Sequence, residues 1–270
     1  MNRGIVIGRA LAVPWYIGRA LARPRRAGGI TLGRILVIPL FFLLLEVLVR
    51  GGLLDPLFVA APSDFLRALV VRMAGGELLL LTGRTLAEFG VGFAVCAIVG
   101  LPMGYLFWRL PVAGRAYEPL LGGILASPTI LLYPVFLIFF GRTAGAIIAL
   151  IAVHATIPIV LNTRQALEEV SSTFIKVGRS LNLSERQIFR HILLPAAVPI
   201  IFAGLRLGII YMLLGIIALE FIIGIGGLGW FISEVGFRFD APALYAGIAM
   251  VFMLSVSVMY FLNRAQRSLR

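Results

Sequence analysis

Charged residues and cysteines are scarce in this sequence of 270 residues. Only 13% of the residues are charged, whereas 60% are hydrophobic and the mean hydropathy is +1.03. A water-soluble domain of this size could not bury so much apolar surface, so we expect a membrane protein. The single cysteine, Cys96, lies within an apolar run, which excludes an intrachain disulfide and a cysteine zinc cluster.

Motifs for ATP chemistry are also missing. The sequence contains neither G-x-x-x-x-G-K-S/T nor the arrangement of a catalytic triad. Residues 224–229 fit G-x-G-x-x-G, but they follow an apolar run, so a turn or re-entrant segment is favoured over a dinucleotide site. His154 has no Glu or second His at metalloprotease spacing, and we expect a satisfied buried histidine. We therefore expect no enzyme activity, no metal and no cofactor bound by this chain.

Six apolar segments are long enough to cross a bilayer, which takes about 20 helical residues. They are residues 32–49, 85–107, 119–140, 144–161, 196–223 and 244–262. The predicted fold class is therefore all-α integral membrane, with six transmembrane helices. Between the first two spans, Pro62, Ser63 and Asp64 precede apolar residues at helical spacing, which predicts a capped amphipathic helix on the outer membrane surface.

The basic residues are distributed asymmetrically across these spans. The chain has 24 Lys and Arg and a formal net charge of +12, but these residues lie between apolar segments, which argues against nucleic-acid binding. Seventeen fall on the side of the N-terminus, six fall on the opposite side and Arg206 lies within a span. The positive-inside rule then places both termini in the cytoplasm. Residues 1–31, in which IGRALA occurs twice, are expected to form a basic arm on anionic lipid, and residues 32–270 the transmembrane domain.

Several residues within the spans are candidates for lining a transport pathway. Prolines at 119, 128, 134 and 158 predict kinks, and irregular backbone in a membrane protein adjoins a cavity or packed protein. Ser127, Thr129 and Tyr133 would then line the pathway, with helix packing as an equal alternative. Glu220 could line the pathway or hold a neighbouring helix, and we favour the second role.

The longest polar stretch of the sequence, within the loop 162–194, predicts a rigid knob on the cytoplasmic side. A first helix over 173–181 places Phe174, Val177, Gly178 and Leu181 on one face, where Gly178 permits close backbone approach. Asn182 suits a left-handed turn. Ser184 with Gln187 predicts a capping box that starts a second helix, which Pro195 should break.

The run KVGRSLNLSERQIFRHILLP, residues 176–195, resembles the cytoplasmic signature of ABC importer permeases. Ile192, Leu194 and Pro195 match its I-x-LP ending, whereas 176–178 replace the EAA triplet and Asn182 replaces a glycine. Other segments resemble the nitrate, sulfonate, taurine and bicarbonate branch of that family from residue 32 onward: APSDFLRAL, TGRTLAEFGVGFAVCAIVGLPMGYL, SPTILLYPVFLIFFG, GLR at 204–206, ALE at 218–220 and GLG at 227–229.

This resemblance implies a type I ABC importer permease fold in the bacterial inner membrane, with 173–181 as a coupling helix between helices four and five. The residues implied to contact the ATPase are Phe174, Lys176, Val177, Gly178, Arg179, Leu181, Asn182, Arg186 and Phe189. The implied partners are a second copy of the chain, two ATPase subunits that hold ATP and Mg²⁺, a periplasmic or lipid-anchored substrate-binding protein, and the bilayer. The implied solute is small and anionic. A secondary transporter or channel, and less so an intramembrane enzyme, remain alternatives.

Overall fold

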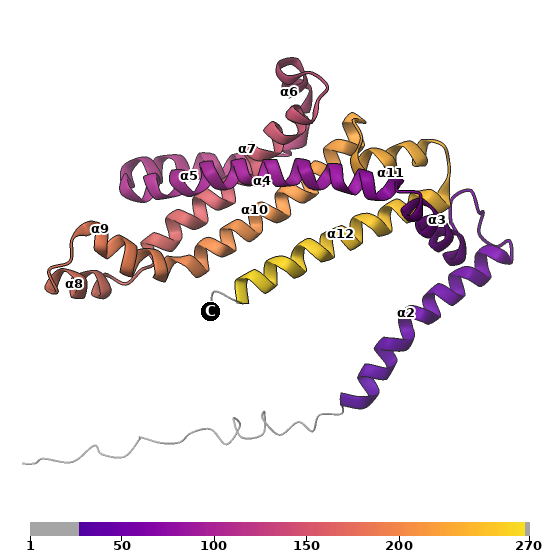
Figure 1. The fold of residues 1–270 in the computed structure, drawn as a ribbon, viewed down its shortest axis with the longest axis horizontal. Helices are drawn as coiled ribbons and strands as arrows, with labels where there is room; N and C mark the ends of the chain where they lie inside the picture. The colour runs from indigo at the N-terminus through magenta and orange to yellow at the C-terminus, as the bar shows by residue number, and fades with distance from the viewer. Residues whose placement is uncertain (1–26, 268–270) are drawn as a thin grey trace, which may run out of the picture.

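The computed structural model describes residues 27–267, and this part of the chain is helical (Figure 1). The elements are α2 (Ala27–Arg50), α3 (Pro62–Ala74), α4 (Glu77–Arg109), α5 (Pro111–Ala126), the 3-10 turn η1 (Thr129–Leu132), α6 (Tyr133–Phe140), α7 (Ala144–Glu168), α8 (Ser172–Ser180), α9 (Glu185–Ile188), the π turn η2 (Phe189–Leu193), α10 (Leu194–Ile223), α11 (Gly227–Phe237) and α12 (Ala241–Arg267). The expected basic arm lies outside the described residues, except that α2 begins at Ala27, before the expected boundary at residue 32.

Four helical segments among the described residues are long and apolar enough to cross a membrane. They are Glu77–Arg109, Ala144–Glu168, Glu185–Ile223 and Ala241–Arg264. A fifth is added if the bent pair Pro111–Ala126 and Thr129–Phe140 is counted as one span. The all-helical membrane class is thus confirmed, whereas six spans stay a prediction, because α2 is not among these segments.

Helix α7 lies at the centre of the bundle, between α4 and α10. Close approach of α4 is possible because small residues recur at every fourth position, at Gly92, Cys96, Gly100 and Gly104, and all four are buried. A Cβ added at Gly100 would lie 2.8 Å from Ile159 of α7. Since lipid offers no hydrophobic driving force between helices, such close packing is what holds the spans together.

The third predicted span, 119–140, is not one helix. Helix α5 begins earlier, at Pro111, and ends at Ala126, and the chain then bends by 86° into η1 and α6. Ser127 has extended backbone angles (φ −74°, ψ 145°), as expected of a residue that precedes a proline. The predicted proline kink is therefore confirmed at Pro128, but as a complete break of the helix.

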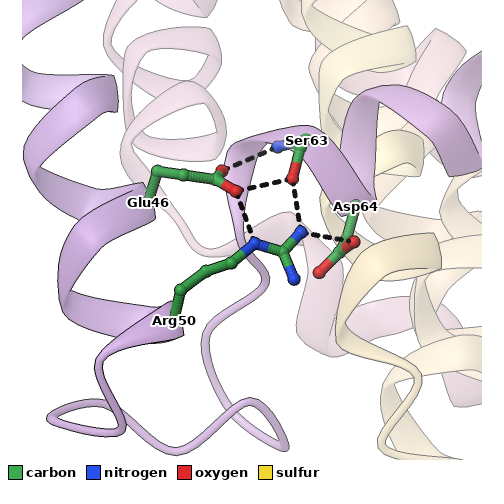
Figure 2. A network of polar contacts seen from close by, with 4 residues as sticks. All are labelled: Glu46, Arg50, Ser63 and Asp64. Carbon is green, nitrogen blue, oxygen red and sulfur yellow. Dashed lines mark hydrogen bonds and ion pairs between the residues drawn. The ribbon is translucent and has the colours of Figure 1, made fainter.

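The amphipathic helix predicted after the first span is present as α3, but the prediction of its cap was wrong. The N-cap residue is Ala61, and no side chain of α3 caps it. Instead, the Glu46 carboxylate of α2 accepts hydrogen bonds from the Ser63 backbone N–H (3.0 Å) and hydroxyl (2.7 Å), as Figure 2 shows. Arg50 bridges Glu46 (2.8 Å) and Asp64 (3.1 Å). An acidic residue from the preceding helix thus supplies the cap that α3 lacks.

Candidate functional site

The predicted knob is formed by α8 and α9 and projects from one end of the long helices. Helices α3 and α11 lie at the opposite end (Figure 1). The fourth predicted span ends later than expected, because α7 continues to Glu168. The knob therefore stands on a helix that extends beyond the predicted membrane segment.

The turn between α8 and α9 has the predicted chemistry. Asn182 adopts a positive φ of 56°. The N–H of Leu183 donates to the Gly178 carbonyl (3.1 Å), and the N–H of Asn182 donates to that of Arg179 (3.0 Å), which is the Schellman pattern of a helix end. Ser184 and Gln187 form the predicted capping box. The bonds within this stretch fix the angle between the two short helices.

Three apolar side chains of the knob are exposed, and we call them the knob patch: Phe174 (58% exposed), Val177 (51%) and Leu181 (67%). Basic side chains of the same short helices are also exposed, namely Lys176, Arg179 and Arg186. Arg179 forms an ion pair with Glu185 at 3.2 Å. The arrangement can dock on a partner surface that has an apolar pocket and an acidic rim.

Gly178 and Phe189, two of the candidate contact residues, face inward. Gly178 is buried, and a Cβ there would lie 2.7 Å from Cδ1 of Ile192 and 3.2 Å from Cγ1 of Ile188. The close approach at Gly178 is therefore to the chain's own next helix, and its expected place on the exposed face was wrong. Phe189 packs against Tyr105 with ring centroids 5.1 Å apart. Both residues join the knob to the bundle.

The second helix of the knob was predicted to break at Pro195, and this was wrong. A single helical segment runs over Glu185–Ile223. The π turn Phe189–Leu193 lies directly before Pro195, which occupies the first turn of α10. Because a π turn carries wider-spaced hydrogen bonds, it accommodates a residue that lacks an N–H without ending the helix.

Arg164 links the base of the knob to the start of α5, a role that no sequence pattern predicts. Its guanidinium donates to the Gly114 carbonyl (2.7 Å) and pairs with Glu118 (2.9 Å) and Glu168 (2.9 Å). The residue is buried, with 7% exposure. Arg164, which was expected to lie in a loop, therefore links α7 to α5.

Ser127 and Thr129, two of the candidate pathway residues, line one groove at the broken span. We call it the broken-span groove; its polar lining residues are Ser127, Thr129, His154 and Tyr211, and its apolar ones Leu125, Pro128, Ile130, Ile151, Leu214, Gly215 and Ala218. Thr129 is buried and lies 2.5 Å from Nδ1 of His154. Tyr133 is not among the lining residues and packs against the apolar core. His154 and Tyr211 also line the groove, although neither was predicted to do so.

Glu220 is fully buried where α4, α10 and α11 meet. Its carboxylate accepts hydrogen bonds from the Thr85 hydroxyl (2.8 Å) and the Gly229 N–H (2.9 Å). The Thr85 oxygen in turn accepts from the N–H of Leu228 (3.0 Å). This geometry supports the favoured role of Glu220, which was to hold a neighbouring helix. Residues 224–226 form a turn, as expected for a segment after a span, and residues 227–229 are the first residues of α11.

A family model described as "Binding-protein-dependent transport system inner membrane component" matches residues 96–270. The chain belongs to this family. The matched region contains the knob, the broken span and α11, whereas Thr85, which bonds to Glu220, lies before it.

Individual members of the permease family agree with this assignment. The nitrate import permease protein NrtB of Synechocystis sp. is 36% identical over 56% of this chain, and the chain spans about half (54%) of that protein's length. The osmoprotectant import permease protein OsmW of Salmonella typhimurium is 31% identical over 67% of this chain and 85% of that protein. An inward-facing structure of the MetNI methionine ABC transporter shares the fold, with a TM-score of 0.63 and 22% identity over 72% of this chain and 96% of that chain.

Proposed function

We propose that this chain is the transmembrane permease subunit of an ATP-driven importer in a bacterial inner membrane, and that the knob patch docks on an ATPase subunit. The observation that carries the proposal is the exposure of Phe174, Val177 and Leu181 on the knob, whose turn is fixed by its own hydrogen bonds. An exposed apolar face beyond the ends of the spans has no bilayer to enter, so it favours a protein partner.

Family membership supports the rest of the proposed importer. Two copies of this chain would enclose the pathway, and two ATPase subunits would bind ATP and Mg²⁺ on the cytoplasmic side. A periplasmic or lipid-anchored binding protein would deliver the solute. Relatives that are named for nitrate and for bicarbonate support a small anionic solute. The excess of basic residues on the side of the N-terminus supports cytoplasmic termini and therefore a cytoplasmic knob.

Alanine substitution in the knob patch tests the docking. Phe174→Ala and Leu181→Ala each remove apolar surface whose burial is worth about 1.5–3 kcal/mol. Each variant should weaken ATPase association about tenfold or more, measured by co-purification from membranes that contain the full complex. Because both side chains are exposed, the unfolding midpoint of the permease should not change.

Phe252→Ala is the matched control. Phe252 is 69% exposed on α12, far along the chain from the knob. This variant loses the same phenyl group as Phe174→Ala, but its association with the ATPase should not change. Undiminished ATPase association in Phe174→Ala and Leu181→Ala would refute the docking role of the patch.

A further inference from the structure

The broken-span groove lies near the middle of the membrane-spanning bundle. His154 is ten residues beyond Ala144, the first residue of α7. At 1.5 Å per residue this is about 15 Å along the helix, roughly half of a hydrocarbon core of about 30 Å. The groove has a volume of ≈ 320 Å³. That is at the lower end of ligand sites, which start near 300 Å³, so the groove suits a solute of few atoms.

Two polar side chains lie next to each other in this groove but do not form a hydrogen bond with each other. The rings of His154 and Tyr211 lie 5.2 Å apart, edge to face at 84°. Neither Nε2 of His154 nor the Tyr211 hydroxyl has a hydrogen-bond partner among residues 27–267, the part that the structure describes. An unsatisfied polar group at this depth is costly, so both atoms are suited to bind a polar guest.

Thr129 contacts Nδ1 of His154, so the direction of its hydroxyl hydrogen and the tautomer of the ring depend on each other. The Thr129 oxygen lies 2.5 Å from Nδ1 of His154 and 3.2 Å from the Ser127 carbonyl oxygen. The Thr129 hydroxyl donates to that carbonyl, and its hydrogen turns to Nδ1 when the neutral ring carries its own proton on Nε2. In this tautomer Nε2 donates into the groove, whereas in the other tautomer Nδ1 donates to the Thr129 oxygen and Nε2 accepts.

The lining of the groove selects the charge of the guest. It contains no Asp, Glu, Lys or Arg, and its free polar groups are Nε2 of His154 and the Tyr211 hydroxyl. Both donate into the groove when the His154 ring carries its proton on Nε2, and an anion stabilises that tautomer. Donors without a carboxylate favour an anion over a cation. We propose that the broken-span groove is a contact site for a small oxyanion inside the membrane, bound by His154 and Tyr211, with Thr129 as a positioning residue. This rests on the proposed import function and adds a place where the permease itself contacts the solute.

Histidine-selective NMR tests the site directly, because the chain has only two histidines, His154 and His191. The full chain is labelled with ¹⁵N-histidine, reconstituted in nanodiscs and titrated in parallel with nitrate, bicarbonate and ethanesulfonate, against chloride at equal ionic strength. We expect at least one oxyanion to shift the His154 signals saturably, while the exposed His191 does not respond. Tyr211→Phe keeps the ring and removes one donor, so it should weaken the apparent affinity about tenfold.

Two conservative variants separate positioning from packing. Thr129→Val should change the ¹⁵N signature of the His154 tautomer even without anion, and Thr129→Ser should restore it. The site is refuted if none of the three oxyanions shifts His154 selectively, or if Tyr211→Phe binds as tightly as the parent chain. Co-purification of the ATPase distinguishes the two proposals. If the ATPase co-purifies but no anion shifts the His154 signals, only the groove proposal is refuted. If anions shift the His154 signals but no ATPase co-purifies, only the importer proposal is refuted.

Discussion

The two ends of the helical bundle differ in the sequence separation of the residues whose hydrogen bonds shape them. At the knob end, Phe174 and Leu181 are exposed, and the bonds that shape the turn join residues close together in the sequence. At the end that carries α11, Glu220 is fully buried and reaches Thr85, 135 residues away. The α11 end thus contains a buried carboxylate that joins distant parts of the chain, whereas the knob is held by local bonds and exposes the patch that we propose a partner covers. This difference supports a stabilising role for Glu220 and the proposed docking role for the knob patch.

The largest expected effect on stability comes from removing the buried carboxylate of Glu220. Glu220→Ala would leave the Gly229 N–H and the Thr85 hydroxyl without their acceptor in a fully buried position. Each orphaned group costs about 1–3 kcal/mol, so thermal unfolding in nanodiscs should begin at a clearly lower temperature. Glu234→Ala is the control, because Glu234 lies on α11 but is partly exposed, and its ion pair among the described residues is with Arg238, four positions away. Equal unfolding midpoints for the two variants would contradict the role of Glu220.

The same contrast explains what could be predicted from the sequence. Asn182, Ser184 and Gln187 act through bonds that span three to five residues, so their spacing alone predicts the turn and the capping box. Thr85 cannot be linked to Glu220 in this way, because only the packing of α4 on α10 and α11 brings them together. The same holds for the contact between Thr129 and His154, which depends on the angle of the broken span.

The direction in which a residue faces was harder to predict than the element that contains it. Gly178 shares its helical spacing with the knob patch, but its place against Ile188 and Ile192 depends on the angle that the next turn sets. At Pro195 the local rule predicts a break, whereas the π turn of η2 lets the helix continue. Both errors arise where a neighbouring turn overrides a pattern read from one helix.

Filling the space at Gly178 is expected to have the next largest effect. Gly178→Trp would force an indole against Ile188 and Ile192, and overpacking of this kind costs about 1–3 kcal/mol. Hydrogen exchange over residues 184–193 should rise in the permease alone, and ATPase association should fall as a consequence. Gly178→Ala should be mild, because the nearest atom is the mobile end of the Ile192 side chain. Unchanged exchange in Gly178→Trp, with lost ATPase, would mean that Gly178 faces the partner after all.

Asn182 gives a smaller and more local perturbation of the knob. Asn182→Val places a β-branched residue at a φ of 56°, which costs about 1–2 kcal/mol. Asn182→Gly should be tolerated, since glycine adopts positive φ freely. We expect ATPase co-purification to fall in the valine variant and to stay near the parent level in the glycine variant. Equal behaviour of the two variants would show that the turn conformation does not set the position of the knob patch.

The smallest effect is expected at the surface contact between α2 and α3. Glu46→Gln removes the charge that Arg50 pairs with and weakens the cap on the Ser63 N–H. Hydrogen exchange at Ser63 and Asp64 should rise, and the rise should shrink at high salt, because salt already screens the parent's exposed pair. Glu77→Gln is the control, since Glu77 pairs with Arg72 but accepts no backbone hydrogen bond from α3. If Glu77→Gln raised exchange at Ser63 as much as Glu46→Gln does, the effect would reflect the loss of a charge at this end of the bundle, and the carboxylate of Glu46 would not be the cap of α3.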